Sequence, residues 1–553
     1  MLVAASYSAV AQIDPTVDVV RSFDARLGDI VKPPLPTAFT DTLDSFARRT
    51  SYSIQGRPFR NLYDFSPYEA LQIKPKGADT YPLLYLRAGC QFPIMPTAEL
   101  SLQKVFAGGY HFGLNLLHEG FMGETALPGS DWLMYQQSSL NKARADFKYA
   151  WDEGEFLAAA GYSGSGYHTG NTDVEKMLHN YRHDAMSLQA RILSAREEEN
   201  TVYYDFTALY KKTMSAFSPF SQGAPGDTAR LTENFFNVRG KAGTTFEIHR
   251  VYLDINLAFS SYGPAKEYST GIVEFSPVYV YSSRRVKGLL GVKFGNRYGT
   301  DFNDRKSETA SDGNDLTPLS HIFPNVDIRG ELVGGHLWLH GKAGGGFRMN
   351  DWSTLSSQVP LISPQIPLML GTTPLDATLA FESLLWHRLA INAEGAFSME
   401  RRLPVLLPAA PAVAEPALLF PAYRDVNRAS AGLEVLWKSQ DVTLGGEAHH
   451  NWYFTVDGDA GTPWPEWKGD IYVRYNFRER IVASVDFNFQ SSYEAAGITV
   501  PSVADLSLNL NYRISEPFSL FIKCGNIFNR VNAYIPSYPS PGVNFGGGFT
   551  LSL

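Results

Sequence analysis

Long stretches of residues that alternate with a period of two constrain this chain more than any other feature. In residues 251–260, for example, Leu253 and Ile255 fall on one face and Asp254 on the other. This is the pattern of a β-strand with one apolar and one polar face. Many such segments from residue 80 onward are about 10 to 17 residues long, whereas soluble strands usually have about five or six. A tilted strand of about 9 to 11 residues crosses a bilayer. The pattern therefore predicts an all-β protein, a transmembrane antiparallel β-barrel over residues 79–553.

The connections between these segments alternate between short and long, which is typical of outer-membrane barrels. We expect tight turns near the following positions: Asp152-Glu153, Glu198-Glu199, Gly240-Lys241, Ser283-Arg284, Gly334-Gly335, His387, Ser439-Gln440, Glu479 and Ser515-Glu516. We expect long external loops in residues 119–142, 163–183, 299–318, 350–371, 402–421 and 527–541. The pattern gives about 22 strands. An even number places both chain ends on one side, predicted to be the periplasm of a Gram-negative bacterium.

Composition excludes other classes of protein. No run of 18 or more apolar residues occurs after residue 11, which excludes a helical membrane protein. The 48 Lys and Arg against 56 Asp and Glu give a net charge of −8, which argues against a nucleic-acid partner. The two cysteines, Cys90 and Cys524, are too few for a disulfide framework, and we interpret both as small packing residues.

The first 78 residues differ from the rest. Residues 1–11 are apolar and end in small residues, which predicts the remnant of a secretory signal peptide. Residues 12–78 are rich in proline and charge and show no long alternation. We expect them to form an extended arm in the periplasm or in the barrel lumen, because so few residues could bury only a small core.

The C-terminus carries two further signals. Its last residues place Phe545, Phe549, Leu551 and Leu553 on one face of a strand, which resembles the outer-membrane insertion signal of barrel proteins. Before it stands a motif that resembles the C-terminal end of TonB-dependent receptors, and its matching residues are Asn526, Phe528, Asn529, Pro539 and Gly542. That resemblance covers about the last 50 residues.

The resemblance implies an outer-membrane barrel of 22 strands. It also implies a departure, because the family carries a plug domain before the barrel and only residues 12–78 are available here. They lack the glycine-rich texture of a plug. The chain therefore resembles a plugless relative of the TonB-dependent receptors.

Polar residues on the non-lipid faces are candidates to line the lumen: Arg87, Asp254, His340, Lys342, Arg348, Glu394 and Asp486. Both signs of charge occur, which favours internal ion pairing over a ring of one sign. A lumen of this strand number needs a filling, and the arm, inward-folded loops or a partner protein could provide it.

No spacing of residues singles out chemistry. His449 and His450 are adjacent and so would face opposite sides of a strand, and no Ser, His and Asp arrangement stands out as a triad. We expect no enzyme activity, no cofactor and no metal site.

Two functions remain. The missing plug and the proline-rich arm favour a structural subunit of a larger outer-membrane complex, with a barrel-assembly or secretion barrel and surface lipoproteins as partners beside the membrane lipid. The family resemblance favours the alternative, a channel or transporter for nutrient uptake. An adhesin or surface receptor acting through the long loops is a third class.

Overall fold

The computed structural model describes residues 83–553 apart from short stretches of the connections. These stretches are residues 127–132, 172–178, 195–201, 219, 222–223, 226–228, 265–267, 300–319, 359–361, 364–367, 409–418, 456–462, 479, 496 and 536–537. The predicted signal peptide (1–11) and the whole of the predicted arm (12–78) lie outside the described residues, so both stay predictions. Among the described residues, no helix is long and apolar enough to span a membrane.

Twenty-two strands form one sheet. They are β1 (Leu84–Phe92), β2 (Met95–Phe106), β3 (Tyr110–Ala126), β4 (Leu133–Trp151), β5 (Gly154–Asn171), β6 (His179–Ser194), β7 (Val202–Ser218), β10 (Ala229–Phe246), β11 (His249–Pro264), β12 (Tyr268–Ser282), β13 (Val286–Gly299), β14 (Ser320–Val333), β15 (Leu337–Arg348), β16 (Gly371–Leu385), β17 (Leu389–Pro408), β18 (Leu419–Lys438), β19 (Val442–Thr455), β20 (Trp467–Phe477), β21 (Ile481–Gln490), β24 (Val503–Arg513), β25 (Phe518–Gly525) and β28 (Asn544–Ser552). The connections contain β8 (Phe220–Ser221), β9 (Ala224–Pro225), β22 (Tyr493–Ala495), β23 (Ile498–Val500), β26 (Ala533–Ile535), β27 (Tyr538–Pro539) and the short helix α4 (Trp352–Gln358).

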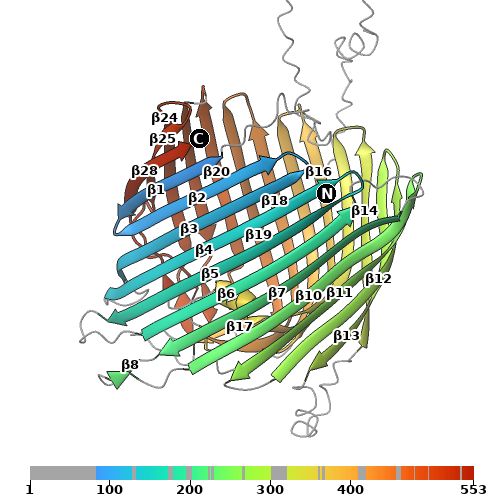
Figure 1. The fold of residues 1–553 in the computed structure, drawn as a ribbon, viewed down its shortest axis with the longest axis horizontal. Helices are drawn as coiled ribbons and strands as arrows, with labels where there is room; N and C mark the ends of the chain where they lie inside the picture. Colours follow the sequence, from blue (N-terminus) through green and yellow to red (C-terminus); the bar gives the residue numbers. More distant parts are fainter. Residues whose placement is uncertain are drawn as a thin grey trace, which may run out of the picture. The chain divides into compact units, whose positions relative to one another are not determined.

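The sheet closes on itself because the first strand pairs with the last. Ala88 of β1 lies opposite Phe549 of β28, and the pairing is antiparallel. Each remaining strand pairs with its neighbours along the chain, so the wall is a closed antiparallel barrel (Figure 1). Closure leaves no edge strand with unpaired backbone groups. The predicted fold class and the strand number are confirmed.

The barrel has two distinct rims. One carries the tight turns, and there the amide of Leu84 donates to the carbonyl of Leu553, so both ends of the barrel lie on it; we call it the turn rim. The other, the loop rim, carries most of the longer connections. Several predicted long loops are shorter than expected because strands extend into them, as β3 and β4 do.

The turn predicted at Gly240 and Lys241 is wrong. Both residues lie inside β10, and that turn is formed by Glu247 and Ile248, with Glu247 at φ 50°. Gly240 is small for a packing reason, since a Cβ there would lie 2.3 Å from the Phe206 ring. Glu198, Glu199 and Glu479 lie outside the described residues; the other predicted turns fall between strands.

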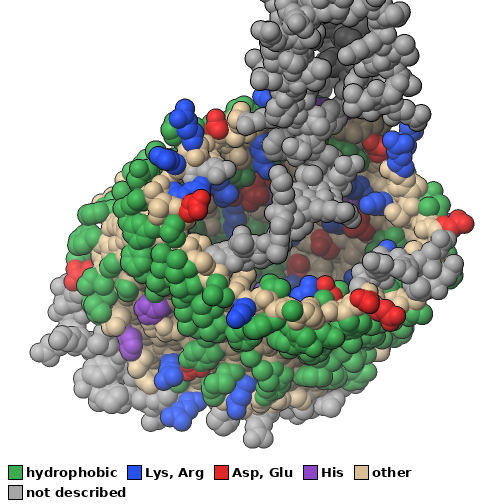
Figure 2. All heavy atoms as spheres, turned by 45° about the horizontal axis from the view of Figure 1, so that its top comes forward, with side chains coloured by type: hydrophobic (Ala, Val, Ile, Leu, Met, Phe, Trp, Pro, Cys, Tyr) green, Lys and Arg blue, Asp and Glu red, His purple; other side chains and the backbone are tan. Residues whose placement is uncertain are grey.

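The strands present an apolar outer face, and much of their inner face is polar. On β11, Val251, Leu253 and Phe259 are all more than 40% exposed on the outside, while Asp254 and Asn256 face the other way. Figure 2 shows apolar side chains over much of the outer wall and charged side chains inside the ring. This arrangement suits a barrel whose outer wall contacts lipid.

Candidate functional site: an inward-folded segment and the charged cavity beside it

The connection between β15 and β16 folds into the barrel. We call its described residues (349–358, 362–363 and 368–370) the lumenal segment; it contains α4, which is seen behind the front wall in Figure 1. Trp352 and Ile362 are fully buried and Leu368 is 1% exposed. They belong to one apolar cluster with wall residues Leu231, Tyr262, Tyr268 and Leu419. The sequence predicted this stretch as a long loop; the structure adds that its described part folds inward, because its apolar side chains are covered by the inner wall.

The lumenal segment reaches two distant parts of the wall. The amide of Ser363 donates to the carbonyl of Leu419 on β18 at 2.8 Å. At its other end, Ser356 Oγ lies 3.2 Å from Nε2 of His183 on β6. Because β6 and β18 lie almost half the ring apart, the segment crosses the lumen.

A buried carboxylate anchors the start of α4. Glu233 of β10 is fully buried. Its Oε1 accepts the amide of Trp352 at 3.0 Å, and its Oε2 accepts the amide of Ser353 at 3.2 Å. Ser260 Oγ donates a third hydrogen bond to Glu233 at 2.7 Å. The first amides of a helix have no partner within the helix, so Glu233 satisfies donors that burial would otherwise leave unpaired.

Asp351 completes this anchor from the segment's own side. Its Oδ2 accepts the amide of Thr354 at 3.1 Å, which is the hydrogen bond of a helix N-cap. Lys211 Nζ of β7 lies 3.6 Å from the same carboxylate and donates to Ser353 Oγ. A wall cation thus lies between the acidic cap and the helix start.

A chain of hydrogen bonds ties the indole and α4 to β6 and β7. Trp352 Nε1 donates to Ser215 Oγ at 2.6 Å. His183 Nδ1 lies 2.8 Å from the same oxygen, and its Nε2 contacts Ser356 Oγ. Four side chains from three elements are therefore joined in one buried network, which fixes the position of the indole.

The family motif organises a second connection, between β25 and β28. Asn526, at φ 45°, donates from Nδ2 to the carbonyls of Arg530 (2.7 Å) and Pro541 (3.0 Å). Asn529, at φ 49°, accepts the amide of Val543 at 2.9 Å. Asparagine tolerates this left-handed backbone better than most residues, and its amide closes the turns.

The remaining motif residues have simpler positions. Phe528 is 52% exposed, and Pro539 is buried in β27 and pairs with Ala533. A Cβ on Gly542 would lie 2.8 Å from Asn529 Oδ1, so a glycine lets this amide approach the backbone closely.

Tyr538 brings this second connection to the lumenal segment. Its ring lies 5.9 Å from the ring of Tyr167 of β5, and it also packs against Tyr181 of β6. It contacts the cluster that contains Trp352 as well. The two connections therefore meet over the inner faces of β5 and β6.

A charged cavity lies on the inner wall beside the lumenal segment. Its volume is about 530 Å³, and its charged lining residues are Arg191, Asp205, Arg239, Lys241, Asp254, Glu274 and Lys293. Glu274 accepts the amide of Phe347, at the end of β15, at 2.9 Å. The cavity thus adjoins the strand that leads into the segment. Arg191 forms a two-point pair with Asp205, at 2.8 and 2.6 Å.

Each of the seven lumen candidates has a definite neighbour. Asp254 lines the cavity and lies 4.0 Å from Lys241 Nζ. Arg348 pairs with Glu400 and donates to Asn350 of the lumenal segment at 3.1 Å. The other five lie elsewhere on the wall. His340 contacts Asp327 (2.8 Å) and Glu382 (3.2 Å), and Lys342 contacts Asp327 (3.9 Å). Glu394 contacts His449 (3.7 Å), Asp486 contacts Ser484 (3.2 Å), and Arg87 lies over the Phe521 ring at 4.3 Å.

The predicted insertion signal lies on one face of β28, where Phe545, Phe549 and Leu553 are exposed. Leu551 follows the same alternation. Recognition of these four residues by an assembly machinery stays a prediction. Within the described part of the chain, no group of three His, Cys, Asp or Glu could hold a metal ion.

The barrel is similar to solved structures of outer-membrane receptors. The copper transporter OprC is 11% identical, with a TM-score of 0.63 over 86% of this chain and 81% of that chain. The siderophore receptor PirA from Acinetobacter baumannii is 10% identical, with a TM-score of 0.62 over 85% and 80%. The FrpB iron transporter from Neisseria meningitidis (F5-1 variant) is 8% identical, with a TM-score of 0.64 over 86% and 83%.

The barrel has the fold of TonB-dependent receptors. No protein-family model matches the sequence, and no curated protein matches it. The similar solved structures are those of transporters and receptors. The plugless interpretation concerns residues outside the described part of the chain and stays a prediction.

The structural similarities contradict the expectation of a structural subunit in an assembly or secretion complex. The similar structures are transporters or receptors for copper, siderophores and iron, and they support the uptake alternative instead. That expectation rested on the predicted absence of a plug. Of the lumen fillings that the sequence left open, the structure shows an inward-folded loop, namely the lumenal segment.

Proposed function

We propose that this protein takes up a small hydrophilic nutrient across the outer membrane through its lumen, and that the lumenal segment controls passage. The observation that carries the proposal is the anchoring of Trp352 and Ser353 to the buried Glu233, inside a barrel of transporter fold. A segment that crosses the lumen and buries its apolar side chains there closes part of the path a solute would take.

The inner wall is suited to a polar solute. The cavity beside the segment presents Arg239, for which no ion pair is recorded among the described residues, together with Lys241, Asp254 and Lys293. Charges of both signs match a chelate or other solute with separated charges better than a simple cation. Structurally similar proteins carry copper, siderophores or iron, so metal chelates are the first substrates to test.

The proposal includes an orientation. The loop rim, with the lumenal segment, faces the outside, and the turn rim, with both ends of the barrel, faces the periplasm. This is the usual arrangement of bacterial barrels, in which short turns are periplasmic.

Uptake is tested directly with labelled substrates. Cells that express the full chain are compared with cells that lack it, for accumulation of radiolabelled iron supplied as several siderophore chelates and of copper. Charge reversal of Arg239 (R239E) should reduce accumulation of an anionic chelate several-fold, while R388E on the turn rim should not. Equal accumulation of every solute with and without the protein would contradict the proposal.

A further inference from the structure

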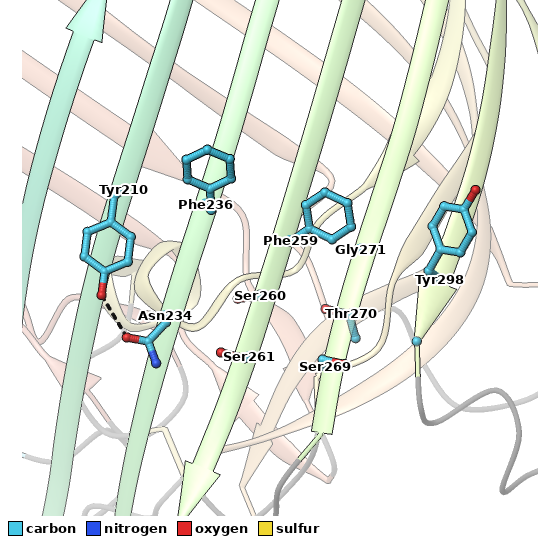
Figure 3. Close-up of a pocket in the computed structure, with 11 residues that line it drawn as sticks. Tyr210, Asn234, Phe236, Phe259, Ser260, Ser261, Ser269, Thr270, Gly271 and Tyr298 are labelled. Carbon is cyan, nitrogen blue, oxygen red and sulfur yellow. Dashed lines mark hydrogen bonds between the residues drawn. The ribbon is translucent and has the colours of Figure 1, made fainter.

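The outer wall carries an aromatic row that runs across β6 to β13. Residues that pair across six strands follow one line on the outside: Leu188, Tyr210, Phe236, Phe259, Gly271 and Tyr298, from β6 to β13. The four aromatic side chains are between 40 and 53% exposed. Figure 3 shows Tyr210, Phe236 and Phe259 on three successive strands, and Tyr298 beyond the strand of Gly271. Because the strands are tilted, the row approaches the loop rim from Leu188 of β6 to Tyr298 of β13. On β10, the exposed ring of Phe236 marks the boundary of the apolar band.

The next outward row, one step toward the loop rim, is polar from β7 to β12. It contains Lys212, Asn234, Ser261 and Ser269, which pair in that order, and Met186 of β6 lies beside Lys212 at its end. Tyr210 Oη donates to Asn234 Oδ1 at 3.0 Å and links the two rows (Figure 3). The wall therefore changes from apolar to polar between these rows.

The opposite boundary is ten residues away along β10, at the exposed Phe246. Ten residues rise about 34 Å along a strand, or about 26 Å along the membrane normal at the usual tilt. That height matches the apolar band of an outer-membrane barrel, so Lys212 lies at the headgroup level of the leaflet on the loop rim.

Three grooves interrupt this part of the outer wall, and all three are lined by Tyr210. Their volumes are about 490, 430 and 550 Å³. They form where the wall has small side chains between large ones: Ala158, Ala190 and Ala208 are paired in one row between Phe147 and Val238. Gly271 lines one of the grooves, and the Phe259 ring packs over it, where a Cβ would lie 2.5 Å from the ring.

Basic side chains stand at the polar end of the grooves. Lys212 lines one groove and has no ion pair or hydrogen bond recorded among the described residues. Arg182 and Arg230 lie in one outward row further toward the loop rim, on either side of Ala216. Arg182 pairs with Asp184 at 2.7 Å, which leaves Lys212 and Arg230 as cations without a recorded partner.

We propose that these grooves bind a membrane lipid that carries phosphate in its headgroup, taken from the leaflet on the loop rim. Its acyl chains lie in the grooves around Tyr210, and its phosphate contacts Lys212 and Arg230. The charge of the polar end selects an anionic headgroup, since each basic residue near a membrane surface contributes about 1 kcal/mol to binding an anionic lipid. The volume and apolar lining of the grooves suit hydrocarbon chains.

The test is the lipid content of the full-length protein. Protein purified from its native membrane in mild detergent is examined by native mass spectrometry, and the retained lipids are extracted and identified. We expect about one anionic lipid per chain in the wild type. K212E should reduce this occupancy roughly tenfold, and A190F, which fills one groove, should also reduce it. Both variants must keep the heat-resistant barrel band on a gel.

Two matched controls isolate the site. R388E reverses a charge on the turn rim, and A393F enlarges an outward alanine between Phe381 and Leu433 on the far wall. Both should retain the lipid. The proposal is overturned if the wild type retains no anionic lipid above its share in the membrane, or if K212E and A190F retain as much as their controls. Transport can fail or succeed without affecting this result.

Discussion

The carboxylate of Glu233 accepts the backbone amide of Trp352 at 3.0 Å in a place where both residues are completely buried. One belongs to the barrel wall and the other to a segment 119 residues further along the chain. This contact fixes the position of the lumenal segment against the barrel wall.

Replacing Glu233 with alanine should release the start of α4. The change leaves two amides and the Ser260 hydroxyl without their acceptor, and each unpaired buried group costs about 1 to 3 kcal/mol. Hydrogen exchange at residues 351–356 should rise by at least about tenfold. E331A on the turn rim is the matched control, and equal exchange in the two variants would contradict the anchoring role.

Tyr538 should contribute through its ring and not through its hydroxyl. No described residue hydrogen-bonds its Oη, whereas its ring packs against Tyr167 and Tyr181. Y538F should therefore be close to wild type in thermal stability. Y538A should lose about 3 to 5 kcal/mol of local stability and loosen both connections. Limited proteolysis of the loop rim measures this, and a Y538F variant as labile as Y538A would refute the packing argument.

The same residue gives a pH dependence. Burial raises the pKa of the Tyr538 phenol well above its ordinary value of 10. A raised pKa means that the stabilisation is complete below pH 10 and is lost as the pH rises through the raised value. The β25–β28 connection should hence open only under strongly alkaline conditions. Y538F should open at higher pH than the wild type in a proteolysis series, and coincident profiles would show that another group titrates.

Asn526 should be hard to replace because it provides both a backbone conformation and two donors. N526G keeps the left-handed φ but loses the bonds to Arg530 and Pro541, whereas N526A loses both. We expect stability losses in the order Ala greater than Gly, with about 2 to 3 kcal/mol for alanine. The melting temperature of the heat-resistant band measures the order, and a larger loss for glycine would contradict it.

The proposed orientation predicts which rim reacts with an impermeant thiol reagent on intact cells. In a background where Cys90 and Cys524 are serine, E494C on the loop rim should be labelled and Q440C on the turn rim should be labelled only after the outer membrane is permeabilised. The native pair must be removed because Cys90 is exposed. The reverse labelling pattern would contradict the proposed orientation of the barrel in the membrane.

The wall could be predicted from sequence because its rule is local. Alternation assigns residues such as Leu253 and Asp254 to opposite faces without knowledge of any partner. The turn predicted at Gly240 is wrong because the glycine is there to make room for the Phe206 ring. That ring becomes its neighbour only after the strands pair. Similarly, Trp352 and Ile362 lie in a polar, proline-rich stretch, and nothing local distinguishes a loop that folds inward from one that extends outward.

The site was missed for the same reason. In the sequence, Glu233 is one acidic residue on an alternating strand. It is important because it accepts hydrogen bonds from two backbone amides far along the chain. His183 and Ser215 reveal their connection only when β6, β7 and α4 are in place. The motif asparagines were identified from a family resemblance, but the backbone groups that they bind, in Arg530, Pro541 and Val543, become apparent only in the folded connection.

The central claim, that the lumenal segment restricts a transport path, is tested most directly by conductance in planar bilayers. The full-length wild type should show small or rare conductance steps. W352A removes the indole that bonds Ser215 and fills the cluster, and it should produce large, frequent openings. W386A, which removes an indole that is 78% exposed on the turn rim, should behave like the wild type. Equal conductance in W352A and the wild type, with the segment shown by hydrogen exchange to be released, would contradict the account.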